Sequence, residues 1–99
     1  MALGLLSACV APAVRPIPLA ASGPVAVERA GKSYIADLQP GEAGAVLSVT
    51  RDASGFAYAE GLEAKRVAEQ FCSSRGARLN PTSFGHYVGK AWVFEGGCA

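Results

Sequence analysis

The chain has 99 residues, nine basic and eight acidic side chains and a net charge of +1. This length accommodates a single domain. From residue 25 onwards the basic side chains balance the acidic ones and form no stripe interleaved with aromatic residues, so we expect no binding to nucleic acid. A domain this small buries limited apolar surface, and a covalent cross-link would contribute much of its stability.

The amino end carries Leu6-Ser7-Ala8-Cys9 at the close of an apolar run. These four residues resemble a lipobox, the recognition site of bacterial lipoprotein signal peptides, in which a Leu and two small residues precede an invariant Cys. The resemblance implies that residues 1–8 form a signal peptide. It also implies that Cys9 is the lipid acceptor and becomes the first residue after cleavage. Val10 follows it in place of an Asp, which by the sorting rule of the family slightly favours the outer membrane.

Two features of residues 1–8 depart from the family pattern, because the segment is short and contains no Lys or Arg. A working signal has a basic n-region and about 7–15 apolar residues, so we expect the true start of the chain to lie upstream. The alternative is an apolar tail with a free cysteine. The apolar run from Met1 to Val14 is shorter than the ~20 residues that a membrane-spanning helix needs, which favours a lipid anchor at a membrane surface.

Residues 9–24 form the anchor and a spacer with four prolines, at positions 12, 16, 18 and 24. Proline fixes φ and lacks a backbone donor, so this run cannot join a helix or the middle of a sheet. It is typical of an extended, semi-rigid tether. We expect the folded domain to span residues 25–99.

Four short segments are predicted as strands: residues 25–29, 32–38, 45–51 and 56–59, the last of which could instead be a loop leading to the helix. The pair Ala30-Gly31 suits a two-residue hairpin turn between the first two. Tyr34, Ala36 and Leu38 share one face of the second strand. Pro40-Gly41 fits the centre of a type II turn within residues 39–44.

The spacing of apolar residues predicts a helix over residues 60–76. Its apolar face, with the i, i+3, i+4, i+7, i+8 pattern of a 3.6-residue period, consists of Ala64, Val67, Ala68, Phe71 and Cys72. On the other face Lys65 and Glu69, and Glu63 and Arg66, stand at spacings that allow ion pairs. Gly76 suits the left-handed residue that ends a helix.

The carboxyl end contains one further predicted strand, residues 91–95, whereas residues 78–88 show no regular pattern beyond a turn at Asn80-Pro81. Phe84 and Tyr87 are expected to anchor this segment to the core. The order ββ(β)αβ predicts an α+β fold, a small and largely antiparallel sheet with one helix packed on one face. The expected core consists of Leu47, Val49, Phe56, Val67, Phe71, Trp92 and Phe94.

The cysteines Cys72 and Cys98 remain if Cys9 is lipidated. An even pair in an exported domain suggests a disulfide, here closing a loop that constrains the unfolded chain by roughly 3–4 kcal/mol. In a reducing compartment, Cys72 would instead be a thiol in the core and Cys98 a free thiol at the end of the chain.

These features favour a non-enzymatic envelope lipoprotein, facing the periplasm, that contacts another envelope component. No cofactor or metal site is expected, because a zinc site from Cys72, His86 and Cys98 would lack a fourth ligand. One alternative is a thiol-dependent enzyme with Cys72 as nucleophile and His86 as base. Another is a soluble ligand-binding domain. Tyr87 is the aromatic residue most expected to face a partner.

Overall fold

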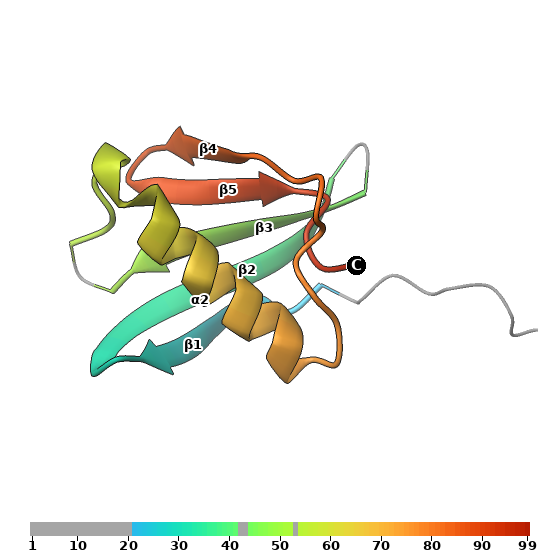
Figure 1. Cartoon of the computed structure of the whole chain (residues 1–99), viewed down its shortest axis with the longest axis horizontal. Coiled ribbons are helices and arrows are strands. Elements are labelled where there is room, and N and C mark those ends of the chain that lie inside the picture. Colours follow the sequence, from blue (N-terminus) through green and yellow to red (C-terminus); the bar gives the residue numbers. More distant parts are fainter. Residues whose placement is uncertain (1–20, 42–43, 53) are drawn as a thin grey trace, which may run out of the picture.

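A computed structural model describes residues 21–41, 44–52 and 54–99. The predicted lipobox, Cys9 and most of the spacer lie outside these residues. The elements in chain order are β1 (Gly23–Arg29), β2 (Lys32–Gly41), β3 (Gly44–Arg51), the 3-10 turn η1 (Tyr58–Glu60), α2 (Gly61–Ser74), β4 (Gly85–Val88) and β5 (Ala91–Glu95). The five strands form one antiparallel sheet in the order β1-β2-β3-β5-β4, with α2 across one face (Figure 1). The predicted α+β class is confirmed.

Two hairpins close with two-residue turns whose central residues have positive φ. Ala30 and Gly31 form the predicted two-residue turn between β1 and β2, with φ of 52° and 78°, and Gly89 and Lys90 join β4 to β5 with φ of 52° and 68°. A positive φ at both central residues is the mark of the type I′ turn, whose twist suits antiparallel strands. The second hairpin was not predicted. The strand β4 reads Gly-His-Tyr-Val and has too little apolar alternation to be recognised, so its pairing with β5 decides its conformation.

The structure corrects two predicted boundaries. The turn expected over residues 39–44 is shorter, because Gly41 pairs with Gly44 and β2 continues through Pro40. A Cβ at Gly41 would lie 2.6 Å from Cγ2 of Val46, so the close approach requires glycine.

The other correction concerns residues 56–59, which form no strand; the alternative expectation, a connection leading to the helix, is confirmed. The Glu60 side chain accepts the backbone N–H of Ala57 at 2.7 Å, and the chain closes into η1. This local hydrogen bond takes up a backbone donor that a strand would have used in a ladder.

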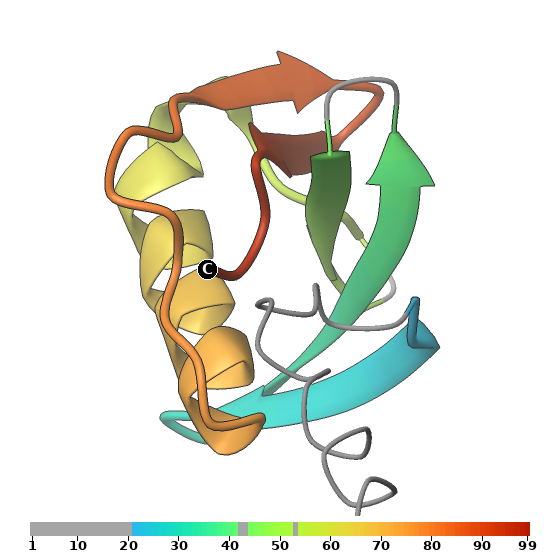
Figure 2. The ribbon, with the colours of Figure 1, turned by 90° about the vertical axis from the view of Figure 1, so that its right-hand side faces the viewer.

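The core lies between α2 and the inner face of the sheet, which curves around the helix (Figure 2). Tyr34, Ala36 and Leu38 of β2 are buried here, as their shared face predicted. The predicted core is confirmed at Leu47, Val49, Phe56, Val67, Phe71 and Phe94, all of which are buried. Trp92 differs, because it packs against the margin of the core and stays half-buried.

Cys72 and Cys98 lie at disulfide distance, with an S–S separation of 2.07 Å and a Cα–Cα separation of 5.3 Å. Cys72 is on the last turns of α2, and Cys98 pairs with Leu79 in an isolated bridge just beyond β5. The helix ends near Gly76, whose φ of 76° is the left-handed conformation predicted for it. The disulfide therefore joins the end of the helix to the end of the chain.

A charged cluster holds the start of α2 against the sheet. Arg51 pairs with Glu60 at 2.9 Å and with Glu63 at 3.3 Å, and the Tyr34 hydroxyl donates to Glu63 at 2.6 Å. The bond from the Ala57 N–H, followed by the pairing with Arg51, lowers the pKa of Glu60. Burial, followed by the bond to Glu63, raises the pKa of Tyr34.

The predicted partners on the surface of α2 are different in the structure. Glu63 is turned toward Arg51, so it does not pair with Arg66, which instead meets Glu69 at 3.1 Å. A long-range partner from the sheet thus takes the place of one expected pair within the helix. In the described part of the chain, no helix combines the length and apolar character needed to cross a bilayer.

Candidate functional site

The strand β4 lies at one margin of the sheet, next to β5 (Figure 1). Alternation places Gly85 and Tyr87 on the inner face, in register with Phe94 and Trp92 of β5. Phe84 precedes the strand, and its side chain is 79% exposed, so the predicted anchoring of this residue to the core is wrong.

Val88, at the other end of β4, is 58% exposed. It shares the outer face with the exposed imidazole of His86, two residues away. The margin of the sheet at β4 therefore carries large apolar side chains in water at both of its ends.

An aromatic cluster holds β4 in place from the inner side. The Tyr87 ring lies 5.7 Å from Tyr58 in an edge-to-face arrangement and 5.6 Å from Trp92. Its hydroxyl donates to the backbone oxygen of Phe56 at 2.6 Å. Tyr87 is half-buried by these contacts, whereas Tyr58 is 73% exposed. The expected anchoring of Tyr87 to the core is therefore confirmed, whereas its contact with a partner stays a prediction.

Trp92 completes the cluster because a glycine opens space for its indole. A Cβ at Gly61, the first residue of α2, would lie 2.9 Å from Cζ2 of Trp92. The indole can therefore pack directly on the first turn of the helix, at the margin of the core. The start of α2, η1 and the β4–β5 hairpin form one packed corner.

The backbone of β4 offers unpaired groups at this edge. In a hairpin closed by a two-residue turn, the residues that flank the turn form the hydrogen-bonded pair, and bonded pairs then alternate. Val88 and His86 therefore turn their N–H and C=O groups toward β5, and Tyr87 and Gly85 turn theirs outwards. Within residues 21–41, 44–52 and 54–99, no strand pairs with the outer side of β4.

At the opposite margin of the sheet, formed by β1, part of the outward-facing backbone is protected against pairing with a further strand. The same alternation turns Glu28, Ala26 and Pro24 outwards from the β1–β2 hairpin. The backbone oxygen of Glu28 accepts a hydrogen bond from the Gln70 side chain at 2.9 Å, and Pro24 has no N–H to donate. Ala26 alone among these three offers both groups to a further strand.

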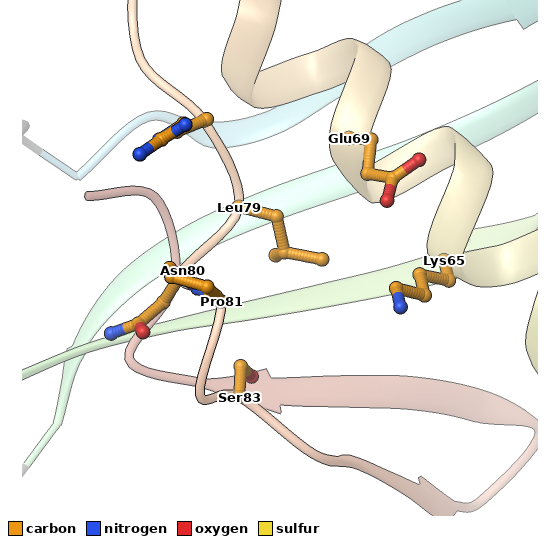
Figure 3. A pocket seen from close by; sticks show the side chains of 7 residues that line it. Lys65, Glu69, Leu79, Asn80, Pro81 and Ser83 are labelled. Atoms are coloured by element: carbon orange, nitrogen blue, oxygen red, sulfur yellow. The ribbon is translucent and has the colours of Figure 1, made fainter.

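A cleft of about 440 Å³ opens between α2 and the segment that leads to β4 (Figure 3). Its lining combines charged and polar side chains with two apolar ones: Lys65, Glu69, Arg78, Leu79, Asn80, Pro81 and Ser83. The Ser83 hydroxyl is buried and hydrogen bonds to no atom of the described chain. A buried hydroxyl of this kind finds its partner in water or a ligand.

The structure does not bring Cys72 and His86 together as a nucleophile and base. Cys72 is buried on the inner side of the sheet and bonded to Cys98, whereas His86 is exposed on the outer face. The described residues also contain no group of three or more His, Cys, Asp or Glu side chains able to hold a metal ion. Cys9, the predicted lipid acceptor, lies outside the described residues.

The strand β4 was not predicted from the sequence, although the spacing of a hairpin is present there. Residues 85–88 and 91–95 are two short segments separated by Gly89-Lys90, which is the spacing of the first hairpin. No protein-family model, curated protein or solved structure matches this chain. Its function is therefore inferred from its own residues.

Proposed function

We propose that this protein is a bacterial envelope lipoprotein, anchored through acylated Cys9 and facing the periplasm, whose domain is a non-enzymatic protein-contact module. The contact surface is the β4 edge, defined here as residues 84–88. The observation that carries the proposal is the outward-facing backbone of Gly85 and Tyr87 on a strand that no other described strand covers.

An exposed edge strand recruits an extended segment by main-chain hydrogen bonds, while side chains at alternate positions give specificity. The β4 edge supplies both, because Phe84 and Val88 flank the outward groups with exposed apolar surface. Stable monomers usually protect such an edge with charge, proline or a covering loop. The β4 edge has no Lys, Arg, Asp or Glu, and its nearest charged residue along the chain is Lys90 in the turn.

The envelope location rests on Leu6-Ser7-Ala8-Cys9 and the Pro-rich spacer, and the Cys72–Cys98 pair at disulfide distance is consistent with export. Intact mass of the chain purified from native membranes tests it. The expected chain begins at Cys9, carries acyl groups and gains two hydrogens on reduction. A Cys9→Ser variant should move to the soluble fraction. A soluble, unacylated wild-type chain would overturn the lipoprotein assignment.

The contact surface is tested by a photo-crosslinking amino acid at position 84, expressed in the native host. We expect an adduct of discrete mass that disappears when Val88→Glu is added. The matched control places the crosslinker at Ala26, an exposed position on β1. Equal adducts at positions 84 and 26 would contradict a contact surface at β4.

A second candidate function is binding of a small polar ligand in the cleft beside α2. The buried, unpartnered Ser83 hydroxyl and the opposite charges of Lys65 and Glu69 in the lining favour this function. Amide chemical-shift changes of the cleft residues upon addition of zwitterionic amino acids would support it. Unchanged shifts for Lys65, Glu69 and Ser83 with each amino acid would contradict binding of that ligand class.

A further inference from the structure

The β4 edge is complementary to itself. Its sequence places the small inner residue Gly85 and the large inner residue Tyr87 on either side of His86. We infer that β4 pairs antiparallel with β4 of a second copy of this chain, about a two-fold axis beside His86. This inference rests on the proposed use of the β4 edge as a contact surface, and it names the partner.

The backbone groups of two copies match in this register. Rotation about the axis sets Gly85 opposite Tyr87 of the second copy, and Tyr87 opposite its Gly85. These are the two residues of each β4 whose N–H and C=O groups point outwards. Each opposed pair can therefore exchange two N–H···O bonds, the closely spaced pattern of an antiparallel ladder. The His86 residues form the intervening pair, whose own backbone bonds are directed to β5.

The side chains also match on both faces. On the inner face Tyr87 meets a glycine, which has no Cβ to obstruct the ring that Tyr58 and Trp92 hold in place. When the same register is continued by one residue beyond β4, it sets Phe84, 79% exposed, opposite Val88, 58% exposed, and the exchange occurs twice by symmetry. Aromatic and β-branched residues directly opposite each other are a favourable cross-strand pair.

The absence of charged side chains allows two copies of the β4 edge to approach each other. Because residues 84–88 contain no Lys, Arg, Asp or Glu, the two edges meet without like charges directly opposite. The strand is short, so the contact is expected to be weak in dilute solution. Anchoring at one membrane would raise the local concentration of copies and favour pairing without any added contact.

A cysteine at the axis provides the direct test. In the non-hydrogen-bonded pair of an antiparallel ladder the Cα atoms lie about 4.5 Å apart, within the range that a disulfide spans. The experiment uses the full chain with Cys9→Ser, so that His86→Cys supplies the single thiol outside the Cys72–Cys98 pair. The control carries Ala26→Cys on β1 instead.

Mild oxidation should produce the His86→Cys dimer at least roughly tenfold faster than the Ala26→Cys dimer, because pairing raises the effective concentration of the two thiols. Equal rates would reflect random collision and overturn the inference. Near-ultraviolet circular dichroism of both variants before oxidation shows that each is folded, and both substituted side chains are exposed in the wild type.

A charge exchange distinguishes a symmetric pair from binding to a different protein. Sedimentation at concentrations up to about 1 mM should detect a wild-type dimer even when the association is weak. His86→Asp and His86→Lys should each be monomeric, because two like charges meet at the axis. An equimolar mixture of the two variants should restore the dimer.

The two proposals fail in different ways. A wild-type chain that stays monomeric at these concentrations, in detergent and in vesicles, overturns the second copy as partner. The β4 edge would still be the contact surface if position 84 crosslinks to a different envelope protein. If a chain without lipid dimerises as the charge exchange predicts, the pairing of β4 is supported. The lipoprotein assignment is tested separately, by the intact mass of the wild-type chain.

Discussion

The two margins of the sheet meet water in opposite ways. At β1 the Gln70 side chain donates a hydrogen bond to the backbone oxygen of Glu28, and Pro24 has no backbone N–H to donate. At β4 the outward groups of Gly85 and Tyr87 have no covering strand in the described chain, and Phe84 beside them is exposed. A proline and a side-chain hydrogen bond thus protect the β1 margin against pairing, whereas residues 84–88 contain no proline and their backbone accepts no such bond from the described chain. This difference is the reason that we propose β4 as the contact surface.

Both margin strands are joined to their neighbours by two-residue turns, but the two hairpins differ in the extent of their pairing. β1 pairs with β2 over seven residue pairs. β5 joins the sheet through four pairs with β3, and β4 joins through four pairs with β5. The Cys72–Cys98 pair links α2 to the chain just beyond β5. The β4 margin therefore depends on long-range contacts, and the following experiments disturb one margin at a time.

The largest effect is expected from Cys72→Ala. Loss of the disulfide should lower the free energy of unfolding by roughly 2–5 kcal/mol under oxidising conditions, because the unfolded chain is no longer constrained. Thermal unfolding measures the loss, and Cys98→Ala should match it. Amide hydrogen exchange should rise more in β4 and β5 than in β1 and β2. Equal melting temperatures for wild type and variant would show that the two cysteines are not bonded in solution.

A smaller effect is expected from Tyr87→Phe, which removes the hydroxyl that donates to the Phe56 oxygen. The unfolding free energy should fall by about 1 kcal/mol, the usual net value of one hydrogen bond. Tyr58→Phe is the matched control, because that ring is largely exposed and belongs to the same cluster. Urea unfolding that gives equal losses for the two variants would argue against this bond as the support of β4.

The β1 margin can be converted toward an open edge by Pro24→Ala combined with Gln70→Ala. These changes restore a donor and free the Glu28 oxygen, at a cost in stability of about 1 kcal/mol or less, since the lost bond is exposed. The double variant should self-associate more than wild type in sedimentation, because unprotected edges pair. Unchanged association would show that the shape of β1, and not its proline and glutamine, protects this margin.

The smallest effect concerns pH and the corner that supports β4. The pKa of Glu60 is lowered in the folded protein by the Ala57 N–H and then by Arg51. A lowered folded pKa means that the carboxylate stabilises the fold above its unfolded pKa of about 4.3, and this contribution is lost as pH falls through the folded value. Unfolding at pH 7 and pH 3 should therefore differ less in Glu60→Gln than in wild type. An identical difference in both proteins would assign the acid sensitivity to other carboxylates.

The sequence by itself determined the elements whose residues carry their own periodicity. The five apolar positions of α2, from Ala64 to Cys72, follow the helical period and are all buried. The shared face of Tyr34, Ala36 and Leu38 and the turn at Ala30-Gly31 were also predicted correctly. The α+β class followed from these elements, because a sheet and an amphipathic helix must cover each other's apolar faces.

Only the tertiary structure decided which groups those elements leave open. β4 has four residues and little alternation, so its conformation depends on pairing with β5 and on the Tyr87 contacts. Glu63 turned from its neighbour on the helix to Arg51, and Phe84 was left in water, because both outcomes depend on how distant segments approach. The free edge follows from strand order, and strand order is a long-range property that local spacing does not contain.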